Sequence, residues 1–257
     1  MRPVVTPALK IRTAEFGGPK PLICVPLVPG DIEALRAQAS VAIALAPDVI
    51  EWRADYYDEV SAAAMYDGAR ALRDIVGAVP VIYTLRIRDE GGAKLIDQDV
   101  RRDVISSVLR SGLVDIVDLE LRNGPGFIEP VSAVADDSGV RVILSAHDFQ
   151  ATPEVNALLA TIAEMVRMEA DIAKVACMPK APEDLLRLLE ATLVARRMFP
   201  ALPMCTLSMG GLGVATRAAG CLFGSDMTFA VGQAASAPGQ IPVAELRTMI
   251  DGVLRGA

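Results

Sequence analysis

The chain has 257 residues, 52% of them apolar and 22% charged, and its formal net charge is −7 at pH 7. This composition is that of an ordinary folded enzyme and excludes a disordered chain. The acidic balance argues against nonspecific binding of nucleic acid or of an anionic membrane, so any anionic substrate must be attracted by a local group of arginines. No segment approaches the roughly 20 apolar residues that span a bilayer, and residues 1–10 lack the apolar run of a signal peptide, so we expect a cytoplasmic protein.

The sequence offers few ligands for a metal ion. It has one histidine and four cysteines, none of them in a CxxC pair: Cys24, Cys177, Cys205 and Cys221. A structural zinc site would be poorly supplied with ligands. We therefore expect these cysteines to be reduced thiols of the core.

Short apolar or β-branched runs alternate with longer helical patterns along the chain, which is typical of βα units and a parallel sheet. Eight strands are predicted, at residues 22–27, 49–55, 80–86, 116–121, 141–147, 172–178, 204–209 and 227–232. A predicted helix follows each strand, at residues 31–45, 61–76, 97–110, 125–137, 153–169, 182–197, 213–222 and 242–254. This pattern favours a closed (β/α)8 TIM barrel, and we expect a single domain over residues 1–257. Residues 9–16 predict an N-terminal β-hairpin that closes the barrel floor.

Polar side chains at the C-terminal ends of the strands are the candidate site residues, since the active sites of such barrels lie there. Glu51 and Arg53 share one face of the second predicted strand, because side chains alternate along a strand. A structural salt bridge is the alternative interpretation of this pair. Arg86 ends the third predicted strand. Beyond it, Glu90 precedes two glycines that permit unusual backbone angles, and it is placed to hold a neighbouring base.

His147 and Lys174 are the candidates for chemistry. His147 ends the fifth predicted strand and is the only histidine available for acid–base work near neutral pH. Lys174 lies inside the sixth strand among apolar residues, where an unpaired ammonium is costly. Burial is therefore expected to lower its pKa and expose a nucleophilic amine. The alternative is a lysine paired with a carboxylate of the fourth strand, Glu120 or Asp118.

Two loops follow the seventh and eighth predicted strands, at residues 208–213 and 235–240. The first is rich in glycine and opens onto a helix, so its backbone amides suit a phosphate group. Arg217, one turn into that helix, suits a carboxylate equally well. Both anions remain candidates at this point.

Taken together, these residues resemble the type I 3-dehydroquinate dehydratase family. The likeness runs in order from the first barrel strand nearly to the C-terminus, and its most specific parts are the histidine motif, the strand lysine and the last loop. The matching segments are Glu51-Trp52-Arg53, Arg86 with Glu90-Gly91-Gly92, Asp118-Leu119-Glu120-Leu121, Ser145-Ala146-His147-Asp148-Phe149, Lys174, Ser208-Met209 and Ala235-Ser236-Ala237-Pro238-Gly239-Gln240.

The resemblance implies a lyase that converts 3-dehydroquinate into 3-dehydroshikimate and water by syn elimination through a lysine Schiff base, in the shikimate pathway. It implies that Lys174 forms the imine, that His147 is the general acid and base, and that Glu90 orients the histidine. It also implies a homodimer without metal or organic cofactor. Seven residues are implied to hold the substrate or pack against it: Glu51, Arg53, Arg86, Met209, Arg217, Ser236 and Gln240.

One position departs from the family pattern. Pro26 stands near the end of the first barrel strand, where some relatives carry a serine. A serine hydroxyl contact with the substrate is therefore not expected here, although a carbonyl contact stays open.

The implied chemistry accounts for the kinds of residue present. Loss of water β to a ketone requires removal of a weakly acidic α-proton, and a protonated imine supplies the electron sink, so Lys174 is expected to begin neutral. His147 then removes the proton and returns one to the departing hydroxyl from the same side. A substrate carboxylate and several hydroxyls explain the arginines and the amide and hydroxyl side chains.

Two other functions remain open from the sequence. One is another Schiff-base barrel enzyme, such as an aldolase or transaldolase acting on a sugar phosphate. The other is a catalytically silent barrel that binds a small carboxylate. Within the resembled family, breakdown of quinate is the alternative to a role in aromatic biosynthesis.

Overall fold

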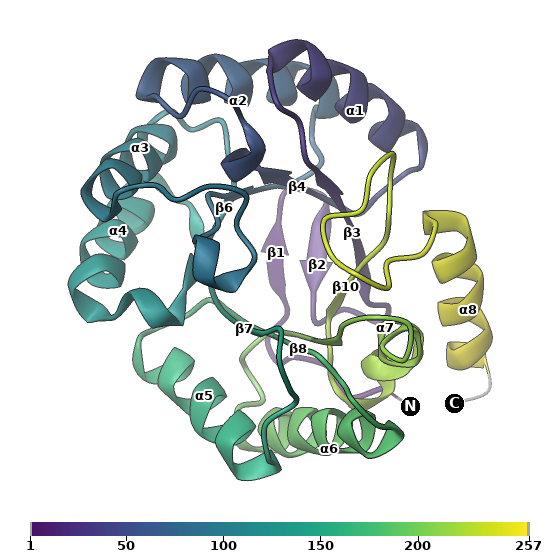
Figure 1. The fold of residues 1–257 in the computed structure, drawn as a ribbon. Helices are drawn as coiled ribbons and strands as arrows, with labels where there is room; N and C mark the ends of the chain where they lie inside the picture. Colours follow the sequence, from purple (N-terminus) through teal and green to yellow (C-terminus); the bar gives the residue numbers. More distant parts are fainter. Residues whose placement is uncertain (1, 256–257) are drawn as a thin grey trace.

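The computed structural model describes residues 2–255, and it confirms the predicted (β/α)8 barrel (Figure 1). The parallel strands follow one another around the barrel in sequence order, from β3 to β10, with β10 hydrogen-bonded to β3. Their bounds are β3 (Leu22–Leu27), β4 (Val49–Arg53), β5 (Val81–Thr84), β6 (Ile116–Glu120), β7 (Arg141–Asp148), β8 (Ile172–Cys177), β9 (Met204–Ser208) and β10 (Met227–Phe229).

A ring of helices covers the outside of the barrel (Figure 1). Their bounds are α1 (Ile32–Ala44), α2 (Ala62–Val76), α3 (Gln98–Arg110), α4 (Pro125–Ser138), α5 (Val155–Arg167), α6 (Pro182–Met198), α7 (Val214–Ala219) and α8 (Val243–Arg255). The predicted helix at 213–222 is divided, because a 3-10 turn, η4 (Gly220–Phe223), follows α7. Three of the predicted strands extend two or three residues beyond those observed: 49–55 turns into η1 (Ala54–Tyr56), 80–86 ends at Thr84, and 227–232 ends at Phe229.

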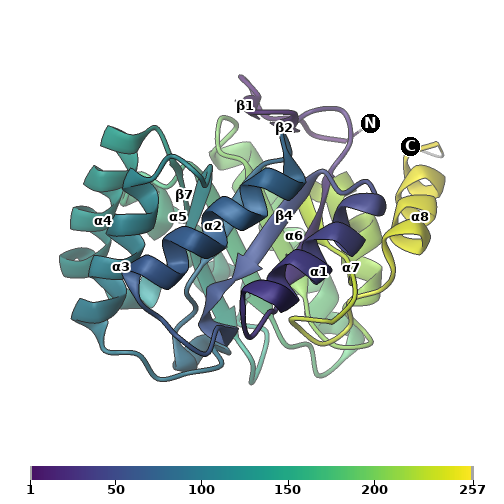
Figure 2. The ribbon, with the colours of Figure 1, turned by 90° about the horizontal axis from the view of Figure 1, so that it is seen from above.

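The N-terminal hairpin closes one end of the barrel, as predicted (Figure 2). Its strands are β1 (Leu9–Ile11) and β2 (Ala14–Phe16), paired antiparallel. Buried side chains of the hairpin pack against the inward-facing side chains near the starts of the barrel strands, among them Ile82, Ile116, Ile143 and Ile172. This apolar plug leaves only the opposite end of the barrel open to a ligand.

Four aspartates tie the strands together in pairs near the hairpin end. Each immediately precedes an even-numbered strand, and its carboxylate accepts the backbone N–H of a residue in the preceding strand at 2.8 Å: Asp48 from Ile23, Asp115 from Val81, Asp171 from Val142 and Asp226 from Met204. The barrel thus repeats a two-strand unit four times. The last contact lies between β9 and β10, where the two strands are not joined in the hydrogen-bonded sheet order.

All four cysteines are buried and free, as predicted. None of the helices within residues 2–255 combines the length and apolar character needed to cross a membrane.

Candidate active site

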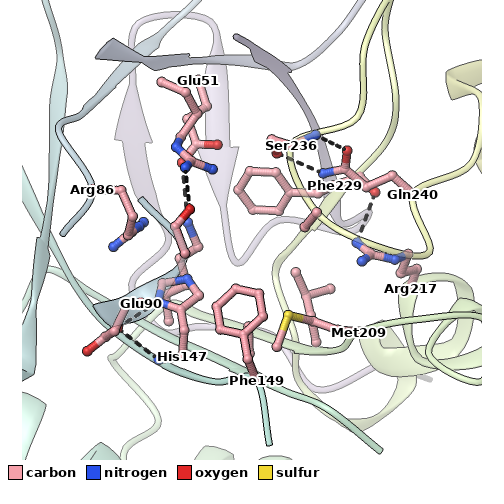
Figure 3. Close-up of a pocket in the computed structure, with 16 residues that line it drawn as sticks. Glu51, Arg86, Glu90, His147, Phe149, Met209, Arg217, Phe229, Ser236 and Gln240 are labelled. Carbon is pink, nitrogen blue, oxygen red and sulfur yellow. Dashed lines mark hydrogen bonds and ion pairs between the residues drawn. The ribbon is translucent and has the colours of Figure 1, made fainter. Parts of the chain in front are cut away.

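A pocket lies at the open end of the barrel (Figure 3). The structure brings all ten predicted site residues to its lining: Glu51, Arg53, Arg86, Glu90, His147, Lys174, Met209, Arg217, Ser236 and Gln240. They come from six strands and the loops that follow them. Side chains of alternate strand residues point inward, so the polar ones stand above the apolar plug and below the mouth.

Lys174 is buried in the pocket wall, with 4% of its surface exposed. Its Nζ atom donates to Oδ2 of Asp118 at 2.8 Å and to Oε1 of Glu51 at 3.4 Å. The same atom lies 4.7 Å from the centre of the Phe229 ring. Thr84 Oγ1 donates to the same Glu51 oxygen at 2.9 Å, which fixes that carboxylate.

The prediction of a lowered lysine pKa is wrong. Burial alone would lower the pKa of Lys174, but the carboxylates of Asp118 and Glu51 raise it above its ordinary value. The sequence left open a nucleophilic lysine and a lysine paired with a carboxylate. Each is partly right, because Lys174 lines a cavity and is also paired with Asp118. Glu120, the other carboxylate considered, makes no ion pair with it.

His147 and Glu90 form a buried pair. The histidine Nδ1 lies 2.9 Å from Oε2 of Glu90, and the same oxygen accepts the backbone N–H of His147 at 3.0 Å. Burial raises the pKa of Glu90 to about 7. Burial, together with the charges of Arg86 and Lys174, holds the pKa of His147 well below its ordinary value. The imidazole is therefore neutral. Because Oε2 of Glu90 already acts as an acceptor for the backbone N–H, we assign the ring hydrogen to Nδ1, which leaves a lone pair on Nε2.

Arg86 is the centre of a buried ionic cluster. Its Nη1 and Nη2 atoms donate to the two oxygens of Asp118 at 2.9 and 2.8 Å, and Nη1 also donates to Glu120 at 3.0 Å and to Ser145 Oγ at 2.8 Å. Ser145 in turn donates to Asp118 at 2.6 Å. These contacts hold the guanidinium rigidly beside Lys174.

Arg53 is held by a carboxylate that the sequence did not single out. Its Nε and Nη2 atoms make a two-pronged contact with Asp55, both at 2.8 Å, and Nη2 also donates to the carbonyl of Gly91 at 3.0 Å. Asp55 accepts the backbone N–H of Ala93 at 2.9 Å. The loop that carries Glu90 is thereby tied to the end of β4.

Gly91 is required in that loop for two reasons. Its φ is +83°, a conformation that favours glycine. A Cβ atom placed there would lie 2.6 Å from the Phe149 ring. The ring packs directly on the glycine, and this contact fixes the turn that presents Glu90.

Arg217 differs from the other arginines of the pocket, because no carboxylate within residues 2–255 lies at ion-pair distance from it. It is 3% exposed, and its guanidinium donates to the carbonyls of Phe229 at 3.3 Å and of Pro238 at 3.1 Å. Burial lowers its pKa to about 10. A buried cation without an acidic partner is suited to a negatively charged ligand.

The loop at 235–240 lies over the pocket beside Arg217 (Figure 3). Gln240 Oε1 accepts the backbone N–H of Ser236 at 3.0 Å, and Gln240 Nε2 donates to Ser236 Oγ at 3.2 Å. Gly239 packs so closely on Gly210 that a Cβ atom would lie 2.0 Å from its carbonyl oxygen. The glycine-rich loop therefore supports the covering loop.

Six further residues line the pocket: Gly91, Phe149, Ala176, Leu207, Phe229 and Ala237. Most are apolar, and apolar residues carry no sequence signal that separates pocket walls from core. Strand alternation was the one available signal, since Phe229 follows Met227 on the inward face of β10, and Ala176 follows Lys174 on that of β8.

Fold and site together define a (β/α)8-barrel enzyme whose pocket is suited to a small, negatively charged molecule. Comparison with known proteins makes the assignment specific. The family model of type I 3-dehydroquinase matches residues 23–253. The chain belongs to this family, and it is a lyase of the shikimate pathway.

Individual relatives agree with this assignment. The chain is 44% identical over 246 residues to the 3-dehydroquinate dehydratase of Geobacillus kaustophilus, covering 95% of each chain, and 42% identical over 237 residues to that of Aromatoleum aromaticum, covering 91% of each. The crystal structure of the Geobacillus kaustophilus protein superposes with a TM-score of 0.95 at 41% identity, covering 99% of each chain. The type I 3-dehydroquinate dehydratase from Clostridium difficile, with covalently modified comenic acid, gives a TM-score of 0.93 at 33% identity, covering 97% of this chain and 98% of that one.

Proposed function

We propose that the chain removes water from 3-dehydroquinate by syn elimination, through an imine formed on Lys174, to give 3-dehydroshikimate. The observation that carries this proposal is the position of Lys174, a buried amine that lines the same pocket as Arg217, an arginine with no carboxylate partner within residues 2–255. A substrate that carries both a ketone and a carboxylate matches this pair of side chains, because the Lys174 amine can react with the ketone and Arg217 can bind the carboxylate.

Lys174 is an ammonium in the unliganded site and must lose a proton before it attacks the ketone. The neutral His147 is the available base, since its Nδ1 hydrogen is committed to Glu90. The amine attacks the carbonyl, and His147 returns the proton to the carbonyl oxygen, which leaves as water. This step gives a protonated imine and a neutral His147. This imine is the electron sink of the reaction, so the mechanism needs neither a metal nor an organic cofactor.

The elimination then uses one residue twice. His147 takes the α-proton, and the bonding electrons move into the imine to give an enamine. When these electrons return, the β-hydroxyl leaves, and the imidazolium protonates it to form water. Attack of water on the product imine releases the ketone and restores Lys174.

Substrate contacts divide between the two sides of the pocket. Arg217 binds the carboxylate, while Ser236 and Gln240 cover it from the loop above. On the other side Glu51, Arg53 and Arg86 contact the hydroxyls and the carbonyl oxygen. Met209 packs against the carbon ring, with Phe149 and Phe229.

We also propose that the protein is a homodimer, which rests on the family resemblance alone. Each chain has a mass of 27.2 kDa. Sedimentation equilibrium on the purified protein is expected to give about twice this mass, and a single-chain mass across the working concentration range would remove the proposal.

The proposed reaction is tested by adding borohydride to the protein in the presence of different ketones and weighing the intact protein. Dehydroquinate is expected to give a stable adduct and a conjugated enone detectable by its ultraviolet absorbance. Sugar phosphates are expected to give neither. An adduct with sugar phosphates and none with dehydroquinate would instead support an aldolase.

A further inference from the structure

Arg101 is a charged residue outside the pocket that lies in the wall between the barrel and its helices. It belongs to α3 and is 2% exposed. Its Nε and Nη2 atoms donate to the carbonyl of Leu85 at 3.1 and 2.9 Å, and its guanidinium lies 5.0 Å from the centre of the Phe127 ring. Burying an arginine is costly unless every contact is satisfied, so its position calls for a role beyond helix packing.

The carboxylate of Glu120 joins Arg101 to the pocket. Its Oε2 atom accepts from Arg101 Nη2 at 2.9 Å and from Asn123 Nδ2 at 2.7 Å. Its Oε1 atom accepts from Arg86 Nη1 at 3.0 Å and from the backbone N–H of Ile87 at 3.1 Å. The single carboxylate of Glu120 therefore links Arg101 to Arg86.

The chain of contacts continues to the proposed nucleophile. Arg86 binds both oxygens of Asp118, and Asp118 Oδ2 receives Arg86 Nη2 and Lys174 Nζ, each at 2.8 Å. The charges alternate in sign along the whole path from Arg101 to Lys174. Asp118 Oδ2 is thus shared between the guanidinium of Arg86 and the ammonium of Lys174.

We propose that Arg101 is a positioning residue that acts on Lys174 through Glu120 and Arg86. By pairing with Glu120 it keeps Arg86 bound to Asp118, which weakens the attraction of Asp118 for the Lys174 ammonium. In this way Arg101 sets the pH range in which the amine attacks. This inference rests on the proposed imine at Lys174.

Removal of Arg101 has two effects, and both act in the same direction. Glu120 loses one cation and attracts Arg86 more strongly, which loosens the hold of Arg86 on Asp118. The cluster also becomes more negative by one charge. Each change stabilises the ammonium form of Lys174 and leaves less neutral amine at neutral pH.

The Arg101 substitution leaves the other charged and titratable groups around Lys174 chemically unchanged. They face the lysine from β3, β4, β6, β7 and β9 and from the segment after β5: Cys24, Glu51, Asp118, His147, Cys205 and Arg86. A shift in pH dependence on changing Arg101 therefore reports the chain through Glu120.

The test measures the rate of adduct formation with dehydroquinate and borohydride as a function of pH, using the purified full chain. In Arg101→Met the pH of half-maximal rate is expected to rise by about one unit, so that the rate at pH 7 falls about tenfold, and the rate at high pH is expected to approach that of the wild type. Arg101→Lys keeps the charge and is expected to restore most of the wild-type profile.

Arg196→Met is the matched control. Arg196 is a buried helix arginine, 3% exposed, that pairs with Asp226 near the hairpin end and donates to the carbonyl of Gly224 at 2.7 Å. Its loss removes a similar buried ion pair without touching the chain to Lys174. It is expected to lower stability and to leave the pH profile unmoved.

Should Arg101→Met not fold, Asn123→Ala removes the other side-chain donor to Glu120 Oε2 and is expected to give a smaller shift in the same direction. A folded variant of Arg101 or Asn123 that loses rate equally at every pH shows a merely structural role and overturns the inference. Absence of any adduct in the wild type refutes the imine itself, and is thereby distinguished from a failure of the role assigned to Arg101.

Discussion

Lys174 Nζ lies 2.8 Å from Oδ2 of Asp118, so the amine that lines the pocket is stored as a paired ammonium. The same oxygen also accepts from Arg86 at 2.8 Å. This ion pair fixes the position of the proposed nucleophile and keeps it protonated. The proposed imine therefore requires that substrate binding weaken the contact with Asp118.

Asp118→Asn is expected to destabilise the protein more than it changes the shape of the pocket. Asp118 is fully buried and holds two cations, and removing one partner of a buried pair costs about 3–5 kcal/mol. Urea unfolding measures this loss. Ser145→Ala is the control and is expected to cost about 1 kcal/mol, because it removes a neutral hydroxyl that donates to Asp118 and accepts from Arg86. Equal effects of the two changes would show that Asp118 is not the ionic centre of the cluster.

His147→Ala is expected to separate imine formation from dehydration. His147 makes both proposed proton transfers of the elimination, and loss of a general base typically costs about 10²–10⁴-fold in rate, so turnover is expected to fall near the larger figure. Some covalent adduct should still form, more slowly, because Lys174 remains. Intact mass after borohydride and enone absorbance read both steps from one sample. Substantial turnover by the folded variant would exclude His147 as the acid–base residue.

Arg217→Met is expected to weaken substrate binding without loss of stability. Its proposed partner is the substrate carboxylate, and removing one side of such a pair costs roughly 2–5 kcal/mol of binding, seen as a higher KM. In the free protein Arg217 has no carboxylate partner within residues 2–255, so the unfolding free energy should stay the same or rise. Arg53→Met is the contrasting variant, because it leaves Asp55 buried without its cation and should lower stability. An unchanged KM for Arg217→Met would remove its assigned role.

Glu90→Gln is expected to change how stability depends on pH. The pKa of Glu90 is raised to about 7 by burial. A raised carboxyl pKa contributes stability that is fully present below the ordinary value near 4.5 and is lost as the pH rises through about 7. Glu90→Gln should therefore gain on the order of 3 kcal/mol relative to the wild type between pH 4.5 and pH 8.

Denaturant titrations at those two pH values measure the effect of Glu90→Gln. Glu129→Gln is the matched control, because it makes the same substitution at an exposed carboxylate of α4. If the stability difference between Glu90→Gln and the wild type is the same at both pH values, burial does not raise the pKa of Glu90, and the description of a partly protonated carboxyl is incorrect.

Strand alternation explains why so much of the site followed from the sequence. Glu51 and Arg53, two residues apart, both line the pocket, as does Lys174 from the middle of β8. Polar residues on an otherwise apolar strand are conspicuous, and the barrel places all strand ends at one mouth. The fold was predictable for a related reason, since short apolar strands and longer helical patterns alternate along the chain.

Properties that depend on distances across the barrel could not be predicted from the sequence. The sign of the Lys174 pKa shift is set by carboxylates on β4 and β6, far away in sequence, whose effect exceeds that of burial. In the sequence, Arg101 lies among Asp99, Arg102 and Asp103, a charged pattern that is typical of a solvated helix face. Only the packing of α3 on the strands shows that it is buried against Glu120.

The central claim is that Lys174 is the residue that binds substrate covalently, and peptide mass spectrometry after borohydride reduction with dehydroquinate tests it most directly. We expect one reduced adduct per chain, carried by the peptide that contains Lys174, and no adduct in Lys174→Ala or Lys174→Met, with the fold of both variants verified by circular dichroism. An adduct on another lysine, or one that persists in the folded Lys174 variants, would contradict the account.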